Sequence, residues 1–347
     1  MTDGRTLLVR CDTSVAIGTG HAMRCLALAQ AWQDAGGGAV FAMAEATPAV
    51  EKRLQLESMR VARLKAEPGS AEDAHETVAL ARERQASWVV VDGYRFGADY
   101  QEALKAAGLK VLFVDDNGHA AHYSADLVLN QNVHAKEALY RSRESSTKLL
   151  LGPRYALLRR EFAAWRGWKR EVPDIGRNVL VTMGGSDPDN FTRKAVDGLR
   201  AVKDETLRIR VLAGGSNPHV ASLEELRTDE GNSIQLVRDA TDMPEQMSWA
   251  DLAIAGAGSA CLEMCLMGLP ALLIDLAENQ TPIASEFARR GTAFHLGNSK
   301  TVTPDRIGAE ALRLLTSMAE RSAMSQRGRE LVDGTGAERV VGELLIS

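Results

Sequence analysis

The chain has 347 residues, of which 45% are hydrophobic and 25% charged, and its 41 basic against 46 acidic residues give a net charge of −5. This composition is typical of a globular protein and excludes wholesale disorder, and the small acidic excess gives no electrostatic basis for binding nucleic acid. The length suffices for about two domains of roughly 150 residues each. The four cysteines form no CxxC pair, which indicates buried thiols in a reducing compartment.

No segment has the pattern of a targeting or membrane-spanning element. The first strand-like run begins at Thr6, which is too early for a signal peptide. The most apolar stretch, residues 250–277, is interrupted by three acidic residues and a proline, so it is not expected to cross a bilayer. We therefore expect a cytoplasmic protein that acts as a monomer, inserts into no membrane and binds no nucleic acid.

Short apolar runs alternate with amphipathic segments through the first half of the chain. Continuous apolar runs predict buried strands, and apolar residues three and four apart predict helices. In chain order the pattern predicts strand Thr6–Asp12, helix His21–Ala35, strand Ala39–Ala44, helix Ala49–Leu56, strand Arg60–Leu64, helix Glu72–Arg84, strand Trp88–Asp92, helix Ala98–Ala107, and strands Lys110–Asp115 and Asp126–Asn130. This alternation indicates a parallel sheet covered by helices on both faces.

The alternation lapses between residues 154 and 177. A basic and aromatic run at 159–170 is interpreted as a solvent-exposed amphipathic helix, with contact to phosphate or to a membrane as the alternative. Proline, glycine and polar residues follow it, and they predict a domain linker near Lys169–Gly176.

The strand and helix pattern then resumes. It predicts strand Asn178–Met183, helix Asn190–Val202, strand Arg208–Ala213, helix His219–Arg227, strand Ser233–Val237, helix Met243–Trp249, strand Asp251–Ala255, helix Ser259–Met267, strand Ala271–Asp275, and helices Thr281–Arg290, Pro304–Ser317 and Ala337–Leu345. We therefore predict an α/β protein with two doubly wound, Rossmann-like domains, 1–170 and 171–347, that face each other across a cleft. The last helix can pack back on the first domain.

Ligands of doubly wound sheets bind at the carboxyl ends of the strands, so the loops after strands carry the candidate residues. Gly18 and Gly20 precede the first helix, whose free backbone amides can attract an anion or a polar sugar. His21 begins this helix and either takes a proton from water or serves as a capping or core histidine. Asp12 orients the histidine, binds hydroxyls or forms a turn. Tyr94 offers a ring and a hydroxyl to a sugar, or packs between loop and core.

The loop Asp115–His122 combines two aspartates with two histidines, which raises the question of a metal site. Asn117 and Gly118 indicate a turn instead of one helix face, and no further ligand motif accompanies them. We therefore predict a polar loop here, with no metal and no cofactor.

Two glycine loops follow strands in the second half. Gly184 and Gly185 end one strand, and Gly256 and Gly258 lead into a helix that begins near Ser259. Such turns allow backbone amides to approach a phosphate closely. Neither loop has the GK[ST] ending of a P-loop or the full GxGxxG pattern, which disfavours nucleoside triphosphate hydrolysis and dinucleotide binding.

Three polar residues near these loops have two interpretations each. Glu263 lies one helical turn beyond Ser259, where it either binds a ribose hydroxyl or is an ordinary first-turn acid that favours the helix dipole. Asn279 and Gln280 follow the next strand, where they either reach the ligand or cap the following helix.

Six segments resemble, in the same order, the hydrolases of UDP-2,4-diacetamido-2,4,6-trideoxy-β-L-altropyranose in pseudaminic acid biosynthesis: RCDTSVAIGTGHAMRCLALA, VVVDGYRFG, DDNGHAAHYSADLVLNQN, LLLGPRYALLRREF, VTMGGSDPDN and AGAGSACLEMCLMGLPALLIDLAENQ. The resemblance spans residues 7–291. That family is related to the MurG-type glycosyltransferases, so the resemblance implies a GT-B fold. It also implies that water attacks the anomeric carbon of the UDP-sugar with inversion, releasing UDP without a metal.

The resemblance assigns roles by position. It implies that His21 is the general base and that Tyr94 and Asn279 lie on the sugar side of the site. It further implies that the glycine loops at 184–185 and 256–258, with Ser259 and Glu263, hold UDP, whose uracil lies near residues 237–243. Thr19 stands where some members carry an aromatic residue, and the tail after Gly291 is longer than in the smallest members, which leaves the exact sugar open. The alternatives are a MurG-type transferase and a sugar-nucleotide-binding regulator.

Overall fold

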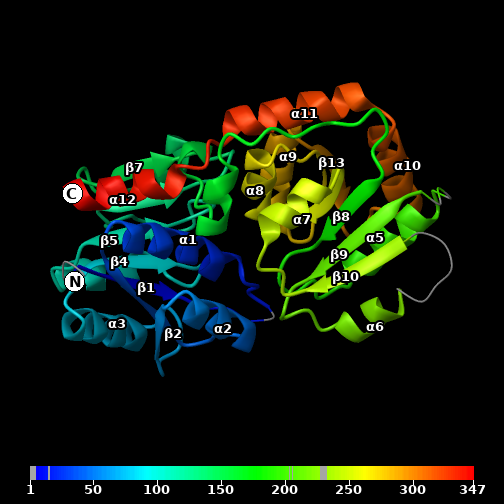
Figure 1. Cartoon of the computed structure of the whole chain (residues 1–347). Coiled ribbons are helices and arrows are strands. Elements are labelled where there is room, and N and C mark those ends of the chain that lie inside the picture. The colour runs from blue at the N-terminus through cyan, green and yellow to red at the C-terminus, as the bar shows by residue number, and fades with distance from the viewer. Residues whose placement is uncertain (1–4, 15, 203, 205, 227–232) are drawn as a thin grey trace. The chain divides into compact units, whose positions relative to one another are not determined.

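The computed structural model describes residues 5–14, 16–202, 204, 206–226 and 233–347 (Figure 1). The chain divides into two compact units. Unit 1 comprises Met1–Arg160 and Gly334–Ser347, and unit 2 comprises Glu161–Asp333. The division falls earlier than the predicted boundary after residue 170, and the end of the chain belongs to unit 1.

The predicted linker belongs to unit 2 because its backbone and one arginine are bound there. Arg170 donates hydrogen bonds to the carbonyl oxygens of Met247 at 2.7 Å and Met267 at 3.2 Å. The Gly176 amide donates to the Leu315 carbonyl at 2.8 Å. The preceding run at 159–170 contains the short 3-10 helix η3 (Arg160–Trp165) where a longer amphipathic helix was expected.

Unit 1 is built on a seven-stranded sheet in the order β3-β2-β1-β4-β5-β6-β7, with every pairing parallel (Figure 1). The strands are β1 (Thr6–Cys11), β2 (Gly38–Met43), β3 (Arg60–Arg63), β4 (Ala86–Asp92), β5 (Val111–Val114), β6 (Leu127–Asn130) and β7 (Lys148–Leu151). The chain runs outward from β1 to β3 and then returns to place β4 on the other side of β1. The strand order therefore reverses between β1 and β4, where Cys11 is paired with Asp92.

Helices cover both faces of this sheet. They are α1 (Gly20–Asp34), α2 (Pro48–Leu56), α3 (Ala71–Glu83), α4 (Ala98–Ala106) and α12 (Gly336–Ile346), with short 3-10 helices η1 (Glu137–Tyr140) and η2 (Pro153–Tyr155). Leu7 and Val9 of β1 belong to the core under α1 and α12, whereas Leu8 belongs to the opposite core under α3 and α4. Strand β1 is thus buried on both sides, which explains its continuous apolar run. Figure 1 shows α12 beside α1, so the last helix packs on unit 1.

Unit 2 repeats the design with a six-stranded parallel sheet in the order β10-β9-β8-β11-β12-β13. Its strands are β8 (Asn178–Thr182), β9 (Arg208–Ala213), β10 (Ser233–Arg238), β11 (Leu252–Gly256), β12 (Ala271–Asp275) and β13 (Phe294–Asn298). Its helices are α5 (Phe191–Arg200), α6 (Val220–Glu225), α7 (Met243–Trp249), α8 (Ala260–Leu266), α9 (Thr281–Arg289), α10 (Pro304–Leu315) and α11 (Met318–Leu331), with η4 (Glu278–Gln280). The strand order reverses between β8 and β11. No helix among the described residues has both the length and the apolarity needed to cross a bilayer.

The predicted class of two α/β, Rossmann-like domains is confirmed, and two strands and one α-helix were missed. Strands β7 and β13 are edge strands with partly exposed residues, and β13 contains Gly297 at a φ of +111°. The apolar run of β7 is only three residues long, and that of β13 is interrupted by His295 and Gly297. Helix α11 buries only Arg321, Ser325 and Gly328, so it lacks an apolar stripe that periodicity can detect. The predicted end of one helix at Arg227 lies outside the described residues.

Candidate active site

The histidine proposed from the sequence lies at the point in unit 1 where the strand order reverses. His21 is the second residue of α1, which follows β1, and it is 8% exposed. Its Nδ1 lies 2.6 Å from Oδ1 of Asp92, the last residue of β4. The two residues are 71 positions apart in sequence, and the parallel pairing of β1 with β4 brings them together. A reversal of this kind is the usual ligand position in a doubly wound sheet.

Arg24 binds the Asp92 carboxylate from one helical turn after the histidine. Its Nε donates to Oδ2 of Asp92 at 2.7 Å and its Nη2 donates to Oδ1 at 2.7 Å, a bidentate pair. Its Nη1 donates to Oδ1 of Asp116 at 2.6 Å. The guanidinium therefore links the carboxylates at the ends of β4 and β5, and its Nη2 lies 3.1 Å from Nδ1 of His21.

The charges of this cluster determine which nitrogen of His21 carries the proton. Burial alone would raise the pKa of the Asp92 carboxyl, but Arg24 and His21 outweigh burial and hold that pKa well below its usual value. An ionised carboxylate only accepts, so Nδ1 of His21 donates to Asp92 and leaves the lone pair on Nε2. Asp92 and Asp116, whose pKa values are both lowered, carry two negative charges against the single charge of Arg24.

Tyr94 lies beside the histidine, on the loop after β4. The two rings meet edge to face with centroids 5.0 Å apart, and the tyrosine is 46% exposed. Its hydroxyl donates to Oδ2 of Asp116 at 2.8 Å, while Asn132 donates to Oδ1 of the same carboxylate at 2.6 Å. An anchored but exposed ring next to His21 offers a surface suited to the apolar face of a sugar.

Asp12, Gly18 and Gly20 lie on the segment that leads from β1 to His21. Oδ1 of Asp12 accepts hydrogen bonds from the backbone amides of Ala44 and Glu45 at 2.8 and 3.0 Å. The orientation of His21 expected of Asp12 belongs instead to Asp92. Gly18 has a φ of +80° and closes a tight turn onto the Ser14 carbonyl at 2.8 Å. Gly20 begins α1, whose first turn carries no acidic residue.

The loop for which a metal site was considered is tied to its own backbone. Oδ1 of Asp115 accepts from the amides of Asn117 and Gly118 at 2.6 and 2.8 Å, the turn that the sequence indicates. His119 Nε2 lies 3.0 Å from the Phe96 carbonyl, and its Nδ1 lies 3.3 Å from Asp115. Among the described residues, no three His, Cys, Asp or Glu side chains are grouped so that they could hold a metal ion.

The two glycine loops of unit 2 follow β8 and β11, the strands between which the order reverses. Gly184 has a φ of +82°, which favours glycine. A Cβ at Gly214, after β9, would lie 2.6 Å from the Cα of Gly185, so these two loops touch through their backbones. Gly256 ends β11, and a Cβ there would lie 2.6 Å from the Leu276 side chain.

The second of these loops leads from β11 into α8 at the carboxyl end of the strand. The Gly258 amide donates to the Gly256 carbonyl at 2.8 Å, and a Cβ at Gly258 would meet open space. Ser259 precedes α8 and makes no side-chain cap to it, while Glu263 lies in the first turn. The Cys261 and Leu262 amides donate to the Gly258 and Ser259 carbonyls, each at 3.1 Å. Among the described residues of this turn, the backbone donors left for a ligand are the amides of Ser259 and Ala260.

The two residues after β12 differ in their contacts. Oε1 of Gln280 accepts from the Leu276 amide at 2.9 Å, so its oxygen holds the loop that follows β12. Asn279 lies with it in η4, immediately before α9. Both therefore lie past the carboxyl end of β12, next to the glycine loop that follows β11.

Sequence reasoning missed Arg24, Asp92, Asp116 and Asn132 as members of the site. Each lies at or just after the carboxyl end of a strand, or one helical turn after His21. An acid that ends a buried strand was the available signal, because a carboxylate is rarely fully buried unless it is paired.

Comparisons with known proteins agree with this architecture. Residues 178–335 match the glycosyltransferase family 28 C-terminal domain. The chain is 26% identical over 287 residues to the UDP-2,4-diacetamido-2,4,6-trideoxy-beta-L-altropyranose hydrolase of Campylobacter jejuni, covering 82% of this chain and 97% of that protein. The crystal structure of Acinetobacter baumannii MurG matches 99% of this chain and 100% of that chain, with a TM-score of 0.65 and 18% identity. The predicted GT-B fold is therefore confirmed.

A further relative is the spore coat polysaccharide biosynthesis protein SpsG of Bacillus subtilis strain 168. The two are 32% identical over 243 residues, which is 67% of this chain and 68% of that protein. This identity exceeds that to the hydrolase, so the comparisons support the broader family more strongly than the predicted hydrolase specificity. The chain belongs to the family of the B. subtilis SpsG protein.

Proposed function

We propose that this chain is a UDP-sugar hydrolase that converts a UDP-linked 2,4-diacetamido-2,4,6-trideoxy hexose, an altropyranose, to UDP and the free sugar in pseudaminic acid biosynthesis. The observation that carries the proposal is the pair of His21 and Asp92, with Nδ1 and Oδ1 2.6 Å apart. A histidine held in this way has its Nε2 lone pair available as a general base.

The chemistry follows from that pair. Nε2 of His21 takes a proton from a water molecule as the water oxygen bonds to the anomeric carbon. The bond between that carbon and the diphosphate oxygen breaks, and its electron pair leaves with UDP. Asp92 stabilises the imidazolium formed, as the carboxylate of a catalytic triad does. Attack opposite the leaving group inverts the anomeric carbon.

Unit 2 is proposed to bind UDP through the loops at 184–185 and 256–258 with Ser259 and Glu263. Backbone amides at a helix start, together with its dipole, can stabilise the charge of a departing diphosphate without a metal. Asp12, Gly18, Gly20, Tyr94, Asn279 and Gln280 are proposed to contact the sugar. The 97% coverage of the C. jejuni hydrolase by this chain supports the same assignment.

A MurG-type glycosyltransferase is the second candidate, and the match of residues 178–335 to the family 28 domain favours it. In that reaction the hydroxyl of an acceptor would replace water, and His21 would deprotonate the hydroxyl. The two candidates differ in whether the purified chain turns over a UDP-sugar in the absence of any acceptor.

The deciding experiment incubates the chain with a panel of UDP-diacetamido sugars in water enriched in oxygen-18. Hydrolysis as proposed places the label in the free sugar and leaves UDP unlabelled. No turnover without an acceptor would support the transferase, and no turnover under any condition would support a sugar-nucleotide-binding regulator.

His21→Asn tests the role of the histidine on the same substrate. Loss of a general base typically costs about 10²–10⁴ in rate, so the variant should remain folded and bind UDP while losing most turnover. If His21 were only a structural cap, the melting temperature would fall and the turnover per folded molecule would stay near that of the wild type.

A further inference from the structure

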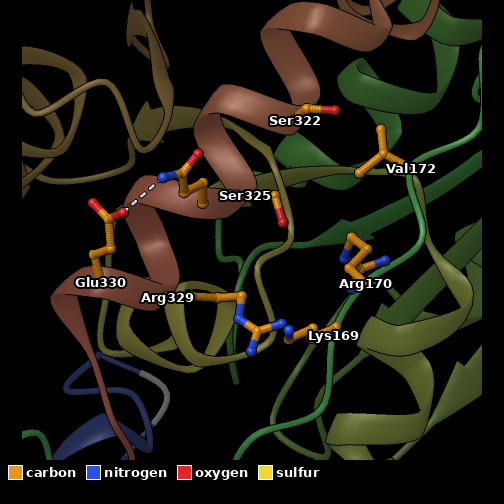
Figure 2. A pocket seen from close by; sticks show the side chains of 8 residues that line it. Lys169, Arg170, Val172, Ser322, Ser325, Arg329 and Glu330 are labelled. Carbon is orange, nitrogen blue, oxygen red and sulfur yellow. Dashed lines mark hydrogen bonds between the residues drawn. The ribbon is translucent and has the colours of Figure 1, made fainter.

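Unit 2 contains a pocket of about 530 Å³ that the proposed reaction does not use. Figure 2 shows it between helix α11 and the extended segment that precedes β8. The volume is within the range of about 300–1,000 Å³ that is typical of small-molecule sites. It is lined by Lys169, Arg170, Val172, Ser322, Ser325, Gln326, Arg329 and Glu330.

The lining is strongly cationic. Lys169, Arg170 and Arg329 contribute three positive charges against the single carboxylate of Glu330, which accepts a hydrogen bond from Gln326 at 2.8 Å. Figure 2 shows the Lys169 and Arg329 side chains pointing toward the same region of the pocket. Across the described ranges, no carboxylate lies within ion-pair distance of any of these three cations. Like charges brought together without a counter-charge repel each other.

Arg170 is held in place by backbone oxygens and by the Trp168 ring, whose centroid lies 5.2 Å from the guanidinium carbon. Its guanidinium donates to the carbonyls of Met247, Ser248 and Ala250, and also to Met267. Burial lowers the pKa of Arg170 to about 10, Asp251 opposes this, and the charge of Arg329 lowers it further. The pocket therefore has a positive charge in its wall that carbonyl dipoles orient but do not neutralise.

The pocket is distinct from the glycine loops of the same unit. Ala250 and Met267, whose carbonyls hold Arg170, lie just before β11 and β12. Gly256 ends β11 and Ser259 follows it, at the other end of that strand. Because the sheet is parallel, the pocket belongs to its amino-terminal edge and the glycine loops to its carboxyl edge.

We propose that this pocket is a second anion site, which binds the phosphate group of a small phosphorylated molecule through Lys169 and Arg329. Two flexible cations suit a phosphate held by charge and hydrogen bonds. The hydroxyls of Ser322 and Ser325, which make no hydrogen bond to another described residue, line the pocket as further donors. Arg170 supplies a fixed positive charge behind them.

The test is calorimetric titration of inorganic pyrophosphate into the full chain, with hydrogen exchange on the same samples. The wild type should bind pyrophosphate with slower exchange in α11, and Lys169→Gln/Arg329→Gln should weaken the affinity roughly ten- to hundredfold. Arg327→Gln is the matched control because Arg327 lies on the same helix and does not line the pocket. The control should bind as the wild type does.

Three results would overturn the proposal. They are no binding to the wild type, equal affinity of the wild type and the double variant, and protection confined to residues 183–190 and 255–263. Melting temperatures of all variants establish that each is folded. None of these measurements depends on turnover of a UDP-sugar, so the failure of the proposed function would leave the result interpretable.

Discussion

Replacing Asp92 by asparagine is a sharp test of the site in unit 1. In the wild type this carboxylate accepts from His21 at 2.6 Å and from Arg24 twice at 2.7 Å. The asparagine oxygen can still accept from Arg24, but its amide nitrogen then faces Nδ1 of His21 as a donor. That arrangement moves the histidine proton to Nε2, the nitrogen that must accept a proton from water.

The expected loss can be estimated for both rate and stability. Removal of a general base costs about 10²–10⁴ in turnover, or roughly 3–5 kcal/mol of barrier. The free energy of unfolding should also fall by about 3 kcal/mol, the lower end of the range for breaking a buried ion pair. The lower end applies because Asp116 still accepts from Arg24 at 2.6 Å.

The stability difference should depend on pH in one direction. The pKa of Asp92 is held well below its usual value, since Arg24 and His21 outweigh the effect of burial. Its contribution is therefore fully present above an unfolded pKa of about 3.9 and is lost as the pH falls through the lower folded pKa. Asp92→Asn should differ from the wild type by a constant amount between about pH 5 and 7, and the difference should shrink below about pH 4.

The assay is release of UDP from the UDP-sugar, measured with the melting temperature on the same preparation. Asp99→Asn is the control, because this residue is an exposed aspartate at the start of α4. A folded Asp92→Asn variant with near wild-type turnover would refute the assignment of the proton to Nδ1 and the role of His21 as base.

Three more predictions concern ligand binding. Gly214→Ala places a Cβ 2.6 Å from the Cα of Gly185, so UDP affinity measured by calorimetry should fall about tenfold or more; unchanged affinity would detach that loop from the UDP site. UDP should slow hydrogen exchange in residues 183–190 and 255–263, and protection restricted to unit 1 would contradict the assignment of UDP to unit 2. Turnover should survive EDTA, whereas loss on chelation with recovery on adding a divalent ion would show that a metal takes part.

The sequence alone was sufficient to predict most of the strands and helices and the two-domain class. Strand β1 carries successive apolar residues because both faces of the sheet are covered, as Leu7 and Leu8 in opposite cores illustrate. Helix α11 was missed because its buried face includes Arg321, whose guanidinium donates to the Leu314 carbonyl at 2.6 Å. The buried face is therefore polar, and hydrophobic periodicity carries no signal for it.

Some residues of the candidate site could be predicted from the sequence, and others could not. His21, Tyr94 and the glycine loops could be named from the sequence because each directly follows a strand, and a strand end is a local feature. The partners of His21 could not be named, since Asp92 lies 71 residues from the histidine and 68 from Arg24. Only the pairing of β1 with β4 determines that these side chains meet. Local periodicity specifies which residues end a strand, whereas the order of strands in the sheet decides which of those ends become neighbours.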